Sequence, residues 1–118
     1  PGSGCLVLET IAHADYCILV AEPTIFGAQN LALVHELTQV MNKPAGVLLN
    51  KVEDGINPSE LYAKEKTLKI LGSLPYDSYV ALENSNAELL VERSEKYRTF
   101  FLELLKEVVD EATLAAQR

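Results

Sequence analysis

The sequence lacks the residue patterns of several common classes of protein. It has no tryptophan, one methionine and two cysteines, Cys5 and Cys17, with no Cys-x-x-Cys pair. Two cysteines do not make a disulfide framework, and neither His13 nor His35 has a partner at metal-ligand spacing. No apolar run approaches the roughly 18–20 residues that span a bilayer, and no basic stretch precedes an apolar one as in a secretory signal. These absences predict a reduced, cytoplasmic protein with no metal site in this chain.

Positive charge is also scarce. Ten Lys and Arg against 17 Asp and Glu give a net charge of −7 and a pI of about 4.7. Such a balance repels phosphate backbones and anionic lipids, so neither nucleic acid nor a membrane is the expected partner. No repeat or linker divides the sequence, and we expect one domain over residues 1–118. The first residue is Pro1 rather than methionine, which predicts a piece of a longer protein.

Two kinds of hydrophobic pattern alternate along the chain. Continuous apolar runs predict a strand buried on both faces at 16–21 and a second strand at 45–49. A third strand is expected at 68–74. Helical periodicity predicts helices at 26–41 and 60–66, and after residue 77 a short element near 87–93 and a longer one at 95–115. This alternation indicates an α/β fold with a mainly parallel sheet flanked by helices. The buried stripes expected in the two long helices are Leu31, Val34, Leu37, Val40 and Met41, and then Phe100, Phe101, Leu104, Leu105, Val108 and Ala112.

Polar or proline residues follow each predicted strand, at 22–24, 50–51 and 75–77. The carboxyl ends of parallel strands meet at one edge of a sheet, which is where open α/β folds bind ligands. Asn50 offers both a donor and an acceptor, the pair that a purine edge needs, although an asparagine here can instead cap the following turn. The Pro75–Asp77 loop also has two interpretations. It is an ordinary turn, or it is a rigid wall whose exposed carbonyls and carboxylate meet an amine of a ligand.

Two further positions have both a functional and a structural interpretation. Glu22 at the end of the first strand is a candidate general base or metal ligand, or a solvated carboxylate, which is the commoner case. The glycines at 1–4 precede a predicted helix at 5–11, and backbone N–H groups there can bind an anion such as phosphate. A simple turn explains the same residues.

Read in order, these segments resemble the MinD/ParA-like P-loop ATPases, the deviant Walker A group related to the nitrogenase iron protein. Residues 1–5 resemble the segment after the switch II aspartate, and residues 14–27 resemble the next strand and its loop. Residues 46–51 match the strand that ends in the adenine-reading asparagine, and 71–77 match the later proline-aspartate loop. The similarity covers essentially the whole chain and is greatest to the subgroup with an inserted ferredoxin-type iron–sulfur domain.

The resemblance implies roles for individual residues. Gly2 would supply a switch II amide near the γ-phosphate. Asn50 would read the adenine edge, and Pro75 and Asp77 would line the other side of the base. Glu22 and Pro23 would lie on the same rim. The complete parent would bind ATP and Mg²⁺ as a homodimer and drive a redox or metal-handling partner.

The chain also departs from the family pattern. The Walker A loop with its lysines, the Mg²⁺-binding hydroxyl and the switch II aspartate are missing, and these groups hold the phosphates and stabilise the transferred charge. The resemblance therefore implies the C-terminal half of a P-loop domain, with no catalytic residue and negligible ATPase activity alone. Any iron–sulfur cluster would belong to the parent only, and no cluster ligands are expected here.

Two alternatives stay open. A half-sheet leaves an unpaired edge strand, so the chain could be a non-enzymatic interaction or dimerisation module. A flavodoxin-like binding domain would need a phosphate-binding loop after the first strand, and Glu22-Pro23 is a poor substitute for one. In a partial domain we expect exposed apolar surface at Ile18, Val20, Val47 and Leu49.

Overall fold

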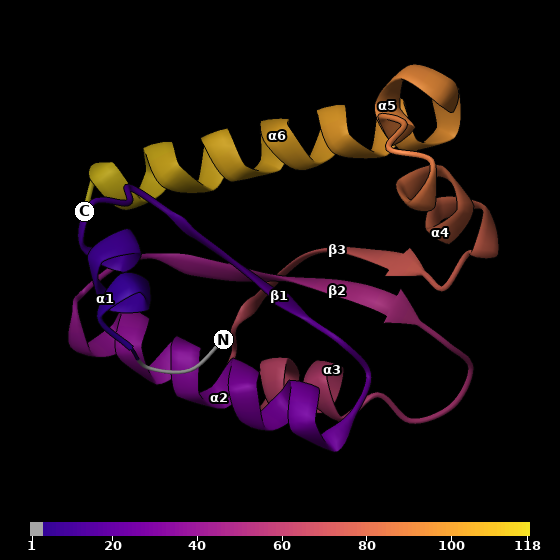
Figure 1. The fold of residues 1–118 in the computed structure, drawn as a ribbon. Helices are drawn as coiled ribbons and strands as arrows, with labels where there is room; N and C mark the ends of the chain where they lie inside the picture. The colour runs from indigo at the N-terminus through magenta and orange to yellow at the C-terminus, as the bar shows by residue number, and fades with distance from the viewer. Residues whose placement is uncertain (1–3) are drawn as a thin grey trace.

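A parallel sheet of three strands forms the centre of the structure (Figure 1). The computed structural model describes residues 4–118, so the predictions for Gly2 fall outside the described residues. The strands lie in the order β1-β2-β3, with β2 pairing in parallel with both neighbours. Their bounds are β1 Cys17–Ala21, β2 Ala45–Val52 and β3 Lys69–Pro75. The predicted α/β class and parallel sheet are confirmed.

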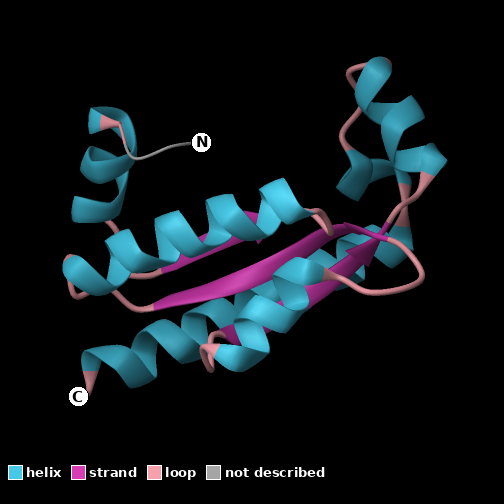
Figure 2. Cartoon of the chain, turned by 90° about the horizontal axis from the view of Figure 1, so that it is seen from below, coloured by secondary structure: helices cyan, strands magenta, loops and turns pink. Residues whose placement is uncertain are grey.

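Helices cover both faces of this sheet (Figures 1 and 2). On one face lie α2 and α3, and on the other α6 crosses the sheet near β3. The helix bounds are α1 Cys5–Ala12, α2 Ile25–Val40, α3 Pro58–Glu65, α4 Ser78–Ser85, α5 Leu90–Arg93 and α6 Glu95–Ala116. No helix among residues 4–118 is long and apolar enough to cross a membrane.

Polar residues at the loop ends determine where the main helices begin. Each of four side chains accepts a hydrogen bond from a backbone N–H in the first turn of its helix, which satisfies a donor that the helix leaves free. These N-cap residues are Thr24 for α2, Asn57 for α3, Asp77 for α4 and Ser94 for α6. Two of the same loops, those after β1 and β3, also carry predicted site residues.

The hydrophobic core lies between the sheet and the α2–α3 layer. Val47 and Leu49 on β2 point into this layer and are buried, so the expectation that they would be exposed is wrong. On β1 the burial alternates, and Ile18 and Val20 on the other face are 43% and 60% exposed. The prediction that β1 is buried on both faces is therefore wrong, because α6 covers the β3 side of that face. The exposure of Ile18 and Val20 is confirmed.

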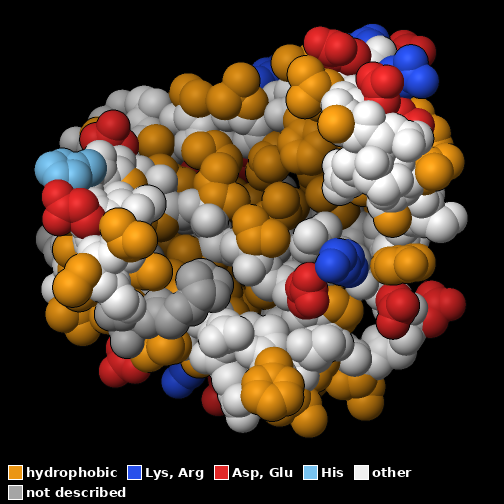
Figure 3. All heavy atoms as spheres, in the orientation of Figure 1, with side chains coloured by type: hydrophobic (Ala, Val, Ile, Leu, Met, Phe, Trp, Pro, Cys, Tyr) orange, Lys and Arg blue, Asp and Glu red, His pale blue; other side chains and the backbone are white. Residues whose placement is uncertain are grey.

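The two predicted helix stripes are only partly correct. In α2, Val40 is 77% exposed, whereas His35 and Thr38 are buried beside Leu31. In α6, Leu105 is 59% exposed because the helix leans on β3 and leaves its flank toward β1 uncovered. Figure 3 shows hydrophobic side chains gathered in the hollow beneath α6. The sheet face on this side thus has an open apolar surface.

We expect the free energy of unfolding to fall as the pH is lowered from about 7.5 to about 5.5. His35 accepts or donates one hydrogen bond with the Tyr62 hydroxyl at 2.9 Å between α2 and α3. Burial, and then the charge of Lys66, lowers the pKa of His35 below its ordinary value of 6.5. In this window the unfolded chain binds a proton that the native chain does not, so acid favours unfolding.

Denaturant unfolding at several pH values measures this slope. His35→Gln should flatten it, because the titrating group is gone. His13→Gln is the matched control, since His13 is exposed at the C-cap of α1. If the unmodified chain and His35→Gln showed the same slope of unfolding free energy against pH, His35 would not be the titrating group.

Candidate functional site

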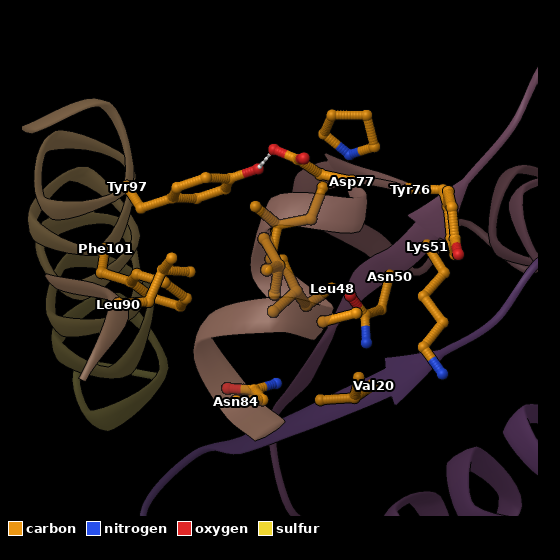
Figure 4. Close-up of a pocket in the computed structure, with 14 residues that line it drawn as sticks. Val20, Leu48, Asn50, Lys51, Tyr76, Asp77, Asn84, Leu90, Tyr97 and Phe101 are labelled. Carbon is orange, nitrogen blue, oxygen red and sulfur yellow. Dashed lines mark hydrogen bonds between the residues drawn. The ribbon is translucent and has the colours of Figure 1, made fainter. Parts of the chain in front are cut away.

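A cavity of about 510 Å³ opens at the carboxyl ends of β2 and β3, beneath the first turns of α6 (Figure 4). Its size is within the range of small-molecule sites, and such sites combine apolar walls with a few polar groups. The apolar walls include Val20, Leu48, Leu74, Leu90 and Phe101. The polar groups are Asn50, Lys51, Tyr76, Asp77, Asn84 and Tyr97. Three of the sequence-predicted residues, Asn50, Pro75 and Asp77, thus line one cavity.

Asn50 presents its amide to this cavity from the last part of β2 (Figure 4). The strand is longer than predicted and continues to Val52, so Asn50 does not cap a turn. None of the side-chain hydrogen bonds within residues 4–118 involves this amide. Its donor and acceptor are therefore available to a ligand, as are those of Asn84 on α4.

The backbone next to Asn50 is irregular. Pairing between β2 and β3 shifts register between Leu49 and Val52, and Lys51 has a positive φ of 53°. The other non-glycine residues with positive φ among 4–118 directly follow helix ends, where a left-handed residue is usual. Lys51 has no such explanation. Bulges and left-handed residues are common beside binding sites because they redirect side chains.

Asp77 has two partners on two elements. One carboxylate oxygen accepts the backbone N–H of Tyr79 at 2.9 Å, which caps α4, and the other accepts the hydroxyl of Tyr97 on α6 at 2.5 Å. These two bonds, that of Tyr97 first, lower the pKa of Asp77, so it is an ionised acceptor at neutral pH. Burial and the same bond raise the pKa of Tyr97 to about 12. The capping interpretation of Asp77 holds, and the residue also lines the cavity.

Glu22 lies beside the cavity rather than in it. Its carboxylate forms an ion pair with Lys51 at 3.0 Å, and it lines a neighbouring hollow of about 290 Å³ together with Asn50. Pro23 lines neither hollow. The Glu22 carbonyl accepts the Ser59 hydroxyl at 2.6 Å, and a Cβ on Gly27 would overlap the same oxygen. The loop after β1 is thus fixed against α2 and α3.

No metal centre lies within residues 4–118. No group of three or more His, Cys, Asp or Glu side chains in the described part of the chain could hold a metal ion. Glu22 has a lysine as its neighbour, which makes it half of a surface ion pair. The cavity instead offers two amides, two tyrosine hydroxyls, one carboxylate, the ammonium of Lys51 and apolar walls, a set suited to a flat polar ring.

Sequence reasoning missed several residues of this site. Phe101 was assigned to the buried stripe of a helix, whereas Tyr97 and Asn84 were not singled out at all. Lys51 was visible as part of the loop after β2, but its backbone conformation was not. Only the three-dimensional placement of α4 and α6 brings these side chains to the strand ends.

No protein-family model matches the chain. No curated protein matches it either.

The strained backbone of Lys51 gives a testable consequence. Lys51→Gly should have a free energy of unfolding about 1 kcal/mol higher than Lys51→Ala, because glycine adopts positive φ without steric cost. Both variants lose the exposed ion pair with Glu22, so the comparison isolates the backbone. Chemical denaturation measures the difference, and equal stabilities would show that position 51 carries no strain.

Proposed function

We propose that the cavity binds the adenine base of ATP, and that the chain supplies the adenine side of the nucleotide site of a MinD/ParA-like P-loop ATPase. The observation that carries the proposal is the Asn50 amide. It lies free of protein hydrogen bonds at the carboxyl end of the central strand, inside an apolar cavity. This is the position in which the sequence resemblance places an adenine-reading asparagine.

The lining suits a purine in three respects. An amide can accept from an exocyclic amine and donate to the adjacent ring nitrogen, so Asn50 matches one edge of adenine. Asp77, as an ionised acceptor, favours a ligand that donates. Val20, Leu48 and Phe101 provide apolar surface against which a flat ring can pack.

Phosphate and magnesium chemistry would belong to other parts of a longer protein. In that parent, the unpaired edge of β1 and the exposed Ile18 and Val20 would be covered by the rest of a P-loop sheet. The parent would then act as a cytoplasmic homodimer that couples ATP hydrolysis to a redox or metal-handling partner. An iron–sulfur cluster, where present, would lie in the parent.

Calorimetric titration of MgATP tests the proposal on this chain and on the longer protein side by side. The longer protein should bind, and Asn50→Ala should weaken binding roughly tenfold to a hundredfold because two hydrogen bonds to the base are lost. Asn86→Ala, on the exposed end of α4, is the matched control and should bind normally. The chain alone should bind weakly or not at all. If the longer protein binds no adenine nucleotide, the proposed function is wrong.

A second candidate function is an interaction module that self-associates through β1. Among residues 4–118 β1 pairs with β2 alone, and its outer edge is unpaired. The exposed Ile18 and Val20 lie beside that edge, and free strand edges of this kind pair readily with another chain.

Sedimentation at increasing concentration separates the two candidates. The interaction module predicts a mass that rises with concentration, is unaffected by nucleotide, and returns to the monomer value in Ile18→Lys. Glu9→Gln on exposed α1 raises the net charge by the same one unit away from the edge and is the control. A monomer at all concentrations would exclude this candidate.

A further inference from the structure

Tyr97 connects the long helix α6 to the carboxylate at the cavity rim. Its side chain is only 3% exposed, and its hydroxyl donates to one oxygen of Asp77 while Tyr79 N–H donates to the other. Figure 4 shows the ring reaching across from α6 to Asp77. Two donors on the two oxygens leave the carboxylate no freedom to rotate without breaking a hydrogen bond.

The packing of α6 keeps the tyrosine in this position. Phe100 lies against Gly72 on β3 so closely that a Cβ there would be 3.2 Å from the phenyl ring. Farther along the helix, Lys69 of β3 forms an ion pair with Glu107 at 3.1 Å. The orientation of Asp77 therefore depends on how α6 packs on the sheet, although this helix begins 18 residues later in the sequence.

We propose that Tyr97 is a positioning residue that holds the Asp77 carboxylate, an acceptor-only group, toward the cavity. A carboxylate held in this way selects a base with an exocyclic amine at that position over a base with a carbonyl. The inference rests on the proposed function, since it concerns the same site. A hydroxyl whose pKa is about 12 stays protonated at neutral pH and always donates to Asp77. The oxygens of Asp77 then have lone pairs left only for a donating ligand. A base with a 6-carbonyl in place of the amine would place its oxygen against an oxygen of Asp77. Both atoms are acceptors, so no hydrogen bond could form between them.

The test compares ATP with ITP, which carries a carbonyl where ATP carries the 6-amine. Binding of both is measured by calorimetry on the longer protein used above. The unmodified protein should prefer ATP, and Tyr97→Phe should reduce that preference about fivefold to tenfold, because a carboxylate held by one hydrogen bond instead of two discriminates less. Tyr79→Phe removes a hydroxyl from a partly exposed ring on α4 and should leave the preference unchanged.

A second variant tests the same idea without removing the tyrosine. Asp77→Asn keeps an N-cap acceptor for α4 but adds a donor, so the preference should shift toward ITP. If ATP binds but Tyr97→Phe weakens both nucleotides equally and Asp77→Asn still prefers ATP, the role of Tyr97 is wrong and the adenine site stands. If neither nucleotide binds the unmodified protein, the proposed function itself fails.

Discussion

Because β2 pairs in parallel with both β1 and β3, all three strands run in the same direction and deliver their following loops to one edge of the sheet. Val47 and Leu49 anchor this central strand in the core against α2 and α3, and Leu48 faces the opposite side. Loops held by a buried strand have little freedom to move. The cavity at the carboxyl edge is therefore set by the core, and its polar groups occupy fixed positions.

The same cavity depends on elements that lie outside the sheet. Its floor comes from β1 and β2, whereas Tyr97 and Phe101 on α6 form the opposite wall. The Tyr97–Asp77 hydrogen bond joins these two parts, since Asp77 follows β3 and Tyr97 lies in the first turn of α6. A rigid strand edge and one docked helix thus share the site, while the neighbouring surface over Ile18 and Val20 stays open.

The sequence predicted the strands and most helices because long apolar runs and N-cap residues leave a local signal. It did not predict which helix positions are buried. His35 and Thr38 replace Val40 in the core, since the polar groups find partners in Tyr62 and a backbone carbonyl. Leu105 is exposed because burial of α6 depends on how far the helix reaches across the sheet. Asn50 and Asp77 were identified as candidates, but Tyr97 was not, because a tyrosine in a helix has no local mark of its distant partner.

Whether a purine base enters the cavity against Asn50 is tested most directly by nuclear magnetic resonance of the longer protein with added adenosine. The side-chain NH₂ signals of Asn50 and Asn84 are separate reporters on two walls of the cavity. The account predicts that both shift on addition of adenosine, together with backbone amides of Tyr76 and Asp77, while signals of α1 and the start of α3 do not move. A spectrum in which the Asn50 amide stays unchanged while other regions shift would contradict it.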